Sequence, residues 1–250
     1  MLVLSAILWR MQDLSIKFMT TKPKIRTLDN FQGSLTDRTF LAVREAIMEL
    51  NFLPGEIIRK QYICNVLGVS RSPVSEALAK LRNEGLVEVV PQSGTFVSKF
   101  SLQDIIEGAF LREAIELACI EILAAKISEQ QLKDLNRNLK FQKVLADTDD
   151  YQGFYQLDAE MHGMIMDFTG YKNLAKVTKT GWVQVDRARQ LLLPIDGRQK
   201  EAFQEHQAVI QALEKRDVKL ARKKMKIHLN QLILLLTPLE KEHPHLFENS

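Results

Sequence analysis

The sequence predicts a mainly α-helical protein with two domains: an N-terminal winged helix-turn-helix with a small β-hairpin wing, and a C-terminal all-α bundle of antiparallel helices. Three observations predict this fold class. Between residues 28 and 97, helical periodicity gives way to the period-two pattern of a hairpin. From residue 102 to residue 236, apolar residues recur at helical spacing with short connections. The length of 250 residues suits two domains that each bury a core.

The composition is that of an ordinary globular protein, with 46% hydrophobic and 26% charged residues. A net charge of +3 does not by itself indicate a nucleic-acid partner, and basic and acidic residues are balanced between residues 31 and 97. A DNA-binding role therefore depends on where the charges stand. Cys64 and Cys119 are far apart in sequence and form no metal-type pair, so we expect buried thiols in a cytoplasmic protein.

Residues 1–27 are interpreted as a flexible leader, or as sequence that precedes a true start at Met11 or Met19. The apolar run over residues 1–9 is too short to span a bilayer, so no membrane association is expected. This run also lacks a preceding basic region and a small-residue cleavage site, which argues against a signal peptide.

The first domain is expected over residues 28–97 and begins with a helix over residues 35–51. One side of this helix is apolar and carries Phe40, Val43, Ile47 and Leu50. The segment FLPGEII then breaks the helical pattern.

A helix-turn-helix follows, a motif that places its second helix in the major groove of DNA. Short helical segments flank Gly68, and the second helix is expected to open at Ser70 or Ser72. Pro73 then falls in its first turn, where a missing N–H costs nothing. After Gly85, the run LVEVV, the turn PQSG and the run TFV predict a hairpin, which is the wing.

The start of this second helix carries the predicted DNA contacts. Arg71 can donate two parallel hydrogen bonds to guanine O6 and N7, a pairing worth about 1–3 kcal/mol of discrimination. Neighbouring hydroxyls suit phosphates and are those of Ser70, Ser72 and Ser75. The expected DNA-backbone contacts are Arg44, Arg59, Lys60 and Lys80, and the wing tip is Gln92, Ser93 and Gly94. The alternative is that Ser70 only caps the helix and Arg71 is a solvated charge; the surrounding pattern favours DNA.

The second domain is expected over residues 102–239, with a polar, frayed tail over residues 240–250. Ser101 with Asp104, and Ser128 with Gln131, are typical of helix starts. The expected helices are 102–126, 129–146, 150–168, 171–192, 199–215 and 217–236, with boundaries marked by Gly170, Pro194 and Gly197. Four aromatic side chains are expected in the core, namely Phe154, Phe168, Tyr171 and Trp182.

Three of the five histidines fall on the inward faces of three different expected helices. Asp158 and His162 are spaced i, i+4, so one helical turn brings both side chains to one side. With His206 and His228 they form a suitable set of ligands for Zn²⁺, Ni²⁺ or Mn²⁺. A single buried histidine is more often a hydrogen-bonded core residue than a metal ligand, whereas the three together with Asp158 leave both interpretations open.

Residues 35–97 resemble a known DNA-binding domain. The segments LPGEII and LGVSRSPVSEALAKLRNEGLVEVVPQSGTFV are similar to that of the GntR family of bacterial transcription regulators. The resemblance implies that Arg71 reads a base. The chain departs from the family at Ser75, where the motif VREAL usually has arginine, and its wing tip is not strongly basic. Operator sequence and affinity therefore do not carry over.

The second domain resembles the helical FCD effector domain of the FadR subfamily, over FYQLDAEMHGMIMDFTGYKNL and EHQAVIQALEKRDVKLARKKMKIHL. In metal-binding members the corresponding D…H pair, EH and last H are the ligands. The resemblance thus implies a metal site of Asp158, His162, His206 and His228. It also places Arg112 near the pocket, where a guanidinium suits a carboxylate; the alternative for Arg112 is a plain ion pair with Glu116. Weaker effector-binding candidates are Arg189, Asn173 and Asn230.

Together these features predict a cytoplasmic bacterial transcription regulator, a repressor rather than an enzyme. It would act as a homodimer on a pseudo-palindromic double-stranded DNA operator, because protein and operator symmetry must agree. Its helical domain would dimerise and bind a divalent transition metal and a small organic-acid effector. Two alternatives are a metal-dependent hydrolase fused to a DNA-binding head, and a regulator whose metal is purely structural. No HExxH-type arrangement supplies the hydrolase with a general base.

Overall fold

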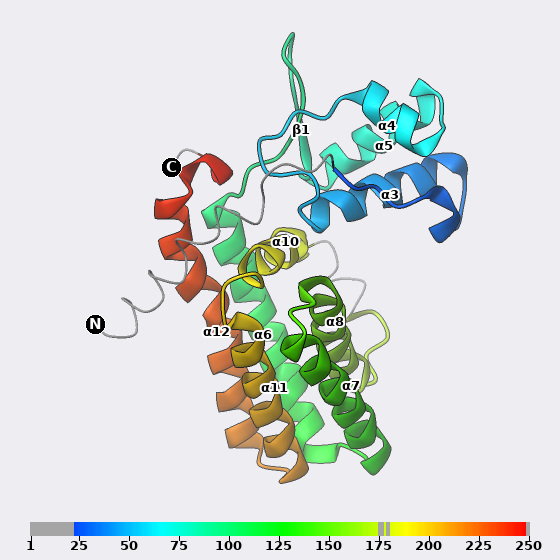
Figure 1. The fold of residues 1–250 in the computed structure, drawn as a ribbon. Coiled ribbons are helices and arrows are strands. Elements are labelled where there is room, and N and C mark those ends of the chain that lie inside the picture. Colours follow the sequence, from blue (N-terminus) through cyan, green and yellow to red (C-terminus); the bar gives the residue numbers. More distant parts are fainter. Residues whose placement is uncertain (1–22, 175–177, 179–180, 249–250) are drawn as a thin grey trace. The chain divides into compact units, whose positions relative to one another are not determined.

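The computed structural model describes residues 23–174, 178 and 181–248. The chain forms two compact units. The bundle is the unit of residues 103–239, and the head is the unit that comprises the described residues up to 102 together with 240–248. The described residues are mainly helical, with one two-stranded antiparallel sheet, which confirms the predicted fold class (Figure 1).

The head begins with a short 3-10 turn, η1 (Leu28–Asn30), and helix α3 (Leu35–Met48). Ser34 caps α3, because its hydroxyl accepts a hydrogen bond from the Asp37 N–H at 3.1 Å. The helix ends three residues earlier than expected because Leu50 adopts a positive φ of 58°. The apolar side packs against the following helices, with Val43, Ile47, Val74 and Leu81 fully buried.

The helix-turn-helix and its wing are confirmed. Helix α4 (Lys60–Leu67) ends at Gly68, whose left-handed φ of 66° makes the turn. Helix α5 (Arg71–Asn83) follows with Ser70 at its N-cap. Strands β1 (Val87–Val90) and β2 (Gly94–Val97) pair in antiparallel register, with Val87 opposite Val97 and Val90 opposite Gly94.

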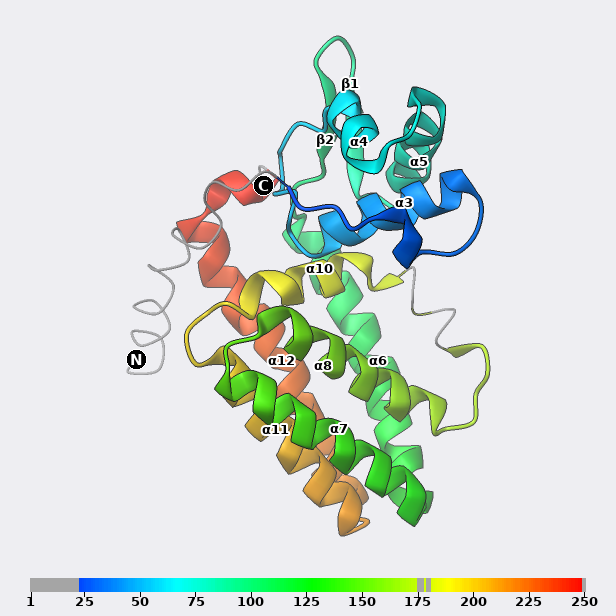
Figure 2. The same ribbon diagram turned by 45° about the vertical axis from the view of Figure 1, so that its right-hand side comes forward.

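The bundle consists of helices that are mostly joined by short loops, with a longer connection between Asp167 and Val183 (Figure 2). They are α6 (Leu102–Lys126), α7 (Glu129–Asp147), α8 (Tyr151–Asp167), α10 (Val183–Leu192), α11 (Arg198–Glu214) and α12 (Val218–Glu242). The predicted capping box of Ser128 and Gln131 is present at the start of α7. Both cysteines are free and buried, as expected. Within the described part of the chain, no helix has the length and apolar character needed to cross a membrane.

The expectation of one continuous helix over residues 171–192 was wrong. Residues 171–173 are not helical, and Trp182 interrupts the helical pattern with φ −108° and ψ 3° before α10 begins. Residues 175–177, 179 and 180 of that segment lie outside the described residues. Tyr171 is 62% exposed and so is not a core residue, whereas Phe154 and Trp182 are buried.

The expectation of a frayed tail was also wrong. Helix α12 continues to Glu242, and a 3-10 turn, η2 (Pro244–Leu246), follows. The Phe100 N–H donates to the Leu246 carbonyl at 3.0 Å, and the Glu248 N–H donates to the Phe100 carbonyl at 2.9 Å. The Phe100 and Phe247 rings lie 5.6 Å apart and are both fully buried. Phe247 fastens this polar segment because its large ring is buried against Phe100.

Most of the predicted leader, residues 1–22, lies outside the described residues. Its described end belongs to the head rather than to a flexible leader. The Tyr62 hydroxyl donates to the Pro23 carbonyl at 2.6 Å, and Arg26 forms ion pairs with Glu45 and Glu49 at 3.3 and 3.4 Å. Residues 23–26, which precede the predicted boundary at Leu28, therefore contact the head.

Replacement of Phe247 by alanine should destabilise the head, because it removes a buried ring that packs on Phe100. We expect the free energy of unfolding to fall by about 3–5 kcal/mol, measured by hydrogen exchange of the amides in α3 and α5. His245→Ala, at an exposed position in the same segment, is the control and should change it by less than about 0.5 kcal/mol. Equal protection in both variants would show that the segment is not part of the head's core.

Candidate functional site

The residues predicted to contact DNA gather around the start of α5 in the head. Ser70, Arg71, Ser72 and Ser75 are all exposed there. A guanidinium N–H of Arg71 donates to the Gln61 side chain of α4 at 3.1 Å, and the Lys60 ammonium lies 3.4 Å from the Ser75 hydroxyl. These exposed donors on α4 and α5 form one polar surface, which suits contacts to base edges and phosphates.

Two other predicted DNA contacts are already paired with carboxylates. The Arg44 guanidinium lies 2.6 Å from Glu84, and the Lys80 ammonium lies 2.7 Å from Asp37. The hydrogen bond from Lys80 lowers the pKa of Asp37 to about 2. Arg59 and Lys60 are exposed, and so are the wing-tip residues Gln92 and Ser93. Among the predicted cationic contacts, the exposed Arg59, Lys60 and Arg71 are the best placed to meet a phosphate.

The bundle brings together the four predicted metal ligands, which come from three helices. Asp158 and His162 lie on α8, His206 on α11 and His228 on α12, and all four side chains are buried. One potential ligand atom from each residue lies within 4.8 Å of the others. The Nε2 atom of His228 is 3.2 Å from that of His162 and 3.3 Å from that of His206. The Oδ1 atom of Asp158 is 3.2 Å from the Nε2 atom of His206.

Each imidazole is also held through its Nδ1 atom, which lies on the side of the ring away from the cluster. The Nδ1 atom of His162 contacts the Glu116 carboxylate on α6. The Nδ1 atom of His206 lies 2.6 Å from the Gln142 amide oxygen on α7, and that of His228 lies 2.7 Å from the Glu205 carboxylate on α11. Since these oxygens only accept hydrogen bonds, each Nδ1 carries the proton and each Nε2 presents a lone pair to the centre of the cluster.

The three imidazoles are neutral at neutral pH. Burial lowers the pKa of His162, and it lowers the pKa of His206 and His228 well below the usual value. Facing lone pairs repel one another, and a cation between them removes that repulsion. Two nitrogen ligands about 2.1 Å from one metal ion lie about 3.0–3.4 Å apart at octahedral or tetrahedral angles. The observed separations of 3.2 and 3.3 Å fit such an ion.

The three residues that hold the imidazoles were not predicted as site residues from the sequence. Glu116 entered only as a partner for Arg112, and neither Gln142 nor Glu205 was named. A signal was nevertheless present, because Gln142 is a polar residue on the apolar side of its helix, between Leu139 and Ala146. Glu205 directly precedes His206. A search for polar residues at inward-facing helix positions would have identified these supporting residues.

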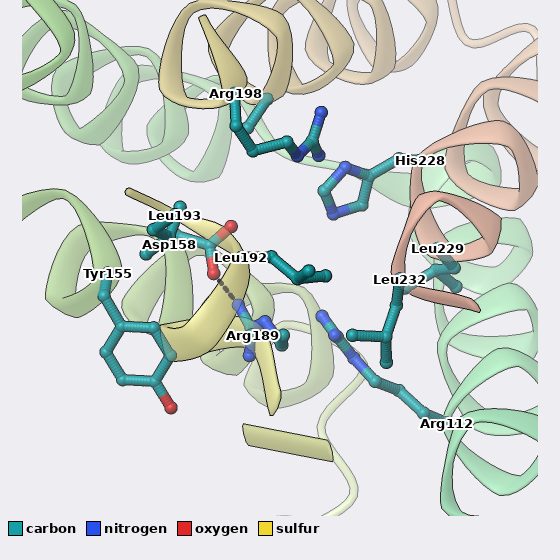
Figure 3. A pocket seen from close by; sticks show the side chains of 11 residues that line it. Arg112, Tyr155, Asp158, Arg189, Leu192, Leu193, Arg198, His228, Leu229 and Leu232 are labelled. Carbon is teal, nitrogen blue, oxygen red and sulfur yellow. Dashed lines mark ion pairs between the residues drawn. The ribbon is translucent and has the colours of Figure 1, made fainter. Parts of the chain in front are cut away.

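A small cavity of about 40 Å³ opens beside the cluster and is lined by Asp158 and His228 among others. Figure 3 shows three arginine side chains around it, Arg112 from α6, Arg189 from α10 and Arg198 from α11. Leucine side chains form its apolar wall, namely Leu192, Leu193, Leu229 and Leu232. Such a cavity, with three guanidinium groups and an apolar wall, suits a small anion with a hydrocarbon part.

Arg112 both forms the expected ion pair with Glu116 and lies beside the pocket, so the two interpretations of this residue are compatible. Its Nε atom lies 2.6 Å from the Glu116 carboxylate in a buried ion pair, and its side chain also lines the cavity. One terminal nitrogen, Nη2, is buried without a hydrogen-bond partner among the described residues. Burial raises the pKa of Glu116, but the Arg112 guanidinium and His162 outweigh burial, so the pKa lies below its usual range. Glu116 is therefore an anion shared by Arg112 and His162.

The other two arginines also pair with carboxylates around the cluster. Arg189 contacts the Asp158 carboxylate (Figure 3) and lies 2.9 Å from Asp186. Burial lowers the pKa of Arg189 to about 9, so it remains charged at neutral pH. Arg198, which sequence reasoning missed, donates two hydrogen bonds of 2.8 Å to Glu205. The three guanidinium groups thus balance the carboxylates of Asp158, Glu116 and Glu205, and the more exposed carboxylates of Asp186 and Glu201 pair with Arg189 and Arg198 as well.

Two weaker candidates do not reach the cavity. Asn173 and Asn230 are exposed and are not among the residues that line it. Asn230 follows His228 by two residues, which is about 200° around an α-helix, so it lies on the opposite side of α12. Asn173 belongs to the turn after α8 and not to a helix face.

Two family models match the chain. Residues 107–231 match the FCD domain, and residues 35–97 match the bacterial regulatory proteins of the gntR family. A similar protein, described as an uncharacterized HTH-type transcriptional regulator in an unstable DNA locus of Streptomyces ambofaciens, is 31% identical over 210 residues. That match covers 83% of this chain and 87% of the relative. The HTH-type transcriptional repressor RspR of Escherichia coli K12 is 26% identical, with 89% of this chain and 98% of RspR covered.

Solved structures share the fold. McbR/YncC of E. coli has a TM-score of 0.69 at 18% identity, with 85% of this chain and 100% of that chain covered. A GntR regulator from Rhodococcus sp. RHA1 has a TM-score of 0.71 at 21% identity, with 82% of this chain and 99% of that chain covered. At these identities the likeness concerns the fold alone.

The buried ion pair between Arg112 and Glu116 yields a stability prediction. Glu116→Ala leaves a buried guanidinium without its partner, so the free energy of unfolding should fall by about 3–5 kcal/mol, measured by urea unfolding followed by circular dichroism. The matched control is Asp147→Ala, which breaks an i, i+4 ion pair of 2.7 Å with Lys143 that is more than half exposed. That control should cost less than about 1 kcal/mol. Similar losses in both variants would contradict a buried role for Glu116.

Proposed function

Since this chain belongs to the GntR family of bacterial transcription regulators and carries an FCD domain, we propose that it is a cytoplasmic repressor controlled by a metal-dependent effector. Residues 28–97 bind a double-stranded DNA operator, and residues 102–239 bind a divalent transition metal and a small organic acid. Regulators of this family bind DNA and typically act as dimers. The relative RspR of E. coli is a transcriptional repressor, which supports repression.

One observation carries the metal proposal: three imidazole Nε2 atoms and a carboxylate oxygen converge, and each imidazole is fixed through Nδ1. Asp158, His162, His206 and His228 would hold the ion. When bound, the metal supplies positive charge and open coordination positions for oxygen atoms of a ligand. Glu116, Gln142 and Glu205 orient the imidazoles and raise their basicity through the Nδ1 hydrogen bonds.

The charges around the cavity support an anionic effector. Arg112 offers the unpartnered Nη2 atom, and Arg189 and Arg198 lie on other sides of the same cavity. These groups favour a carboxylate, because a planar guanidinium donates two parallel hydrogen bonds to it. The leucine wall favours an apolar remainder of the molecule, and the cavity of about 40 Å³ restricts that remainder to a small one. An effector changes the affinity for the operator only to the extent that it binds one arrangement of the two DNA-binding heads more tightly than the other.

The alternatives find less support. The family and its relatives are transcription regulators and not enzymes, which removes the reason to propose a hydrolase. A purely structural metal would account for the histidines, but it leaves unexplained why three arginines line a cavity next to them. Thermal melting distinguishes these two cases. A purely structural metal raises the melting temperature, and an organic acid added afterwards does not raise it further.

Metal content is the first test of the pocket. Purified wild-type protein, loaded with Zn²⁺, Ni²⁺ or Mn²⁺ and dialysed, should hold about one ion per chain by elemental analysis. The double variant His162→Ala/His228→Ala should hold none, because two of four ligands are gone. His243→Ala/His245→Ala removes two histidines outside the cluster and is the control with wild-type stoichiometry. An unchanged metal content in the first variant would remove these histidines from the site.

The DNA-binding surface is tested at Arg71. Arg71→Ala should weaken binding to operator fragments, selected from genomic DNA, by about 5- to 150-fold, because a bidentate contact to guanine contributes about 1–3 kcal/mol. Binding to unrelated DNA should change much less, as measured by fluorescence anisotropy at constant salt. Arg137→Ala, an exposed arginine on α7 of the bundle, is the matched control. Full retention of operator specificity in Arg71→Ala would contradict the assignment.

A further inference from the structure

The bundle has a second pocket, separate from the cavity beside the metal ligands. It has a volume of about 160 Å³ and lies between two connections, the one from α7 to α8 and the one from α10 to α11. The polar groups considered below belong to Asp149, Asp196, Gln199 and Lys200. The second pocket shares no lining residue with the arginine-lined cavity. It is therefore a separate candidate for a ligand site.

Gln199 is the residue of this pocket that indicates a ligand most directly. It is 3% exposed. Neither its amide oxygen nor its amide nitrogen has a hydrogen-bond partner within the described residues. Buried polar side chains normally have partners, because a buried polar atom without one is costly. A molecule that satisfies this amide accepts a hydrogen bond from Nε2 and donates one to Oε1.

The start of α11 adds two backbone donors to the second pocket. Gly197 is the N-cap residue, and it has no side chain with which to cap the helix. The Arg198 N–H donates to the Ile195 carbonyl at 2.9 Å. Within the described part of the chain, the N–H groups of Gln199 and Lys200 have no acceptor. Since a helix N-terminus attracts negative charge, this end of the pocket suits a carboxylate.

Charged groups of both signs line the second pocket. The positive group is the ammonium of Lys200, and the negative groups are the carboxylates of Asp149 and Asp196. None of these three forms an ion pair with another residue that the structure describes. A simple anion would be repelled by the two carboxylates, and a simple cation would be repelled by Lys200 and the helix N-terminus. A molecule that carries both charges meets a partner for each.

We propose that the second pocket binds a small zwitterion of the α-amino-acid class. The carboxylate of the ligand accepts hydrogen bonds from the start of α11 and from Lys200, and its ammonium group donates to Asp149 or Asp196. The buried amide of Gln199 lies between these two groups and donates to one while it accepts from the other. The volume of about 160 Å³ equals the share of about five water molecules. This volume suits an amino acid with a small side chain, such as alanine or serine.

The second pocket is distinct from the effector cavity although the two are neighbours along α11. Arg198 lines the effector cavity, and the next residue, Gln199, lines the second pocket. One apolar cluster contributes to both, with Ala146 at the second pocket and Leu193 and Ala202 at the effector cavity. None of the polar groups of the second pocket belongs to the metal cluster or to its supports. The proposal therefore does not depend on metal binding or on the organic-acid effector.

Equilibrium dialysis of the full-length protein against radiolabelled L-alanine is the first test. We expect saturable binding of about one L-alanine per chain. Propionate lacks the ammonium group and ethylamine lacks the carboxylate, so each should compete about tenfold or more weakly than unlabelled L-alanine, because charge-assisted hydrogen bonds are lost. The absence of saturable binding would overturn the proposal, and so would propionate that competes as well as L-alanine. Displacement of L-alanine by calcium chloride at equal concentration would make the pocket a cation site and would also overturn it.

The variant Gln199→Leu tests where the amino acid binds. It removes both amide atoms at similar volume, so the affinity for L-alanine should fall about tenfold or more. The melting temperature of the ligand-free variant should not fall, because the buried amide has no partner to lose. Gln207→Leu, at an exposed position on the same helix, is the matched control with wild-type affinity. Unchanged L-alanine binding in Gln199→Leu would overturn the proposal, since the amino acid would then bind elsewhere.

Two exposed charges test the orientation of the ligand without disturbing the core. Lys200→Gln should weaken binding of L-alanine but not that of ethylamine, because only the carboxylate loses a partner. Asp196→Asn should weaken binding of L-alanine but not that of propionate, because only the ammonium group loses one. Both side chains are exposed, so both variants should fold. L-alanine binding that is unchanged in both variants would contradict recognition of a zwitterion.

Discussion

The convergence of three imidazole Nε2 atoms on the Asp158 carboxylate is the feature on which the rest of the bundle depends. Each ligand needs a second group behind it, and those groups come from other helices: Glu116 from α6, Gln142 from α7 and Glu205 from α11. The cluster and its supports therefore tie α6, α7, α8, α11 and α12 to one point. Buried polar groups are costly unless they are fully hydrogen-bonded, so this network constrains how the helices pack.

The same network determines the charge of the cavity. Arg112, Arg189 and Arg198 are each matched by a carboxylate that also touches a histidine or belongs to the cluster. A cation bound at the cluster would add positive charge beside the cavity, and this favours an anion there. The metal and the organic acid of the proposed function are thus electrostatically coupled.

Local patterns in the sequence predict much of this structure. The features that they do not predict depend on contacts between segments that are distant in the sequence. The helix-turn-helix, the wing and most helix boundaries follow from periodicity, caps and turn residues, as at Gly68 and Ser128. The spacing of Asp158 and His162 predicts that they share a side of α8. The supports at Glu116 and Gln142 depend on partners on other helices, which spacing within one helix does not reveal. The docked tail was missed for the same reason, since Phe247 gains its place only through Phe100.

The most direct test of the central claim is X-ray absorption spectroscopy of the zinc-loaded protein. We predict a first shell of nitrogen and oxygen atoms at about 2.0–2.1 Å, with the multiple-scattering signature of three imidazoles. His206→Ala should reduce that signature to two imidazoles while the oxygen contribution remains. A shell with fewer than three imidazoles in the wild type, or one that contains sulfur at about 2.3 Å, would contradict the account, because the convergence of the three Nε2 atoms would then not serve to hold a metal.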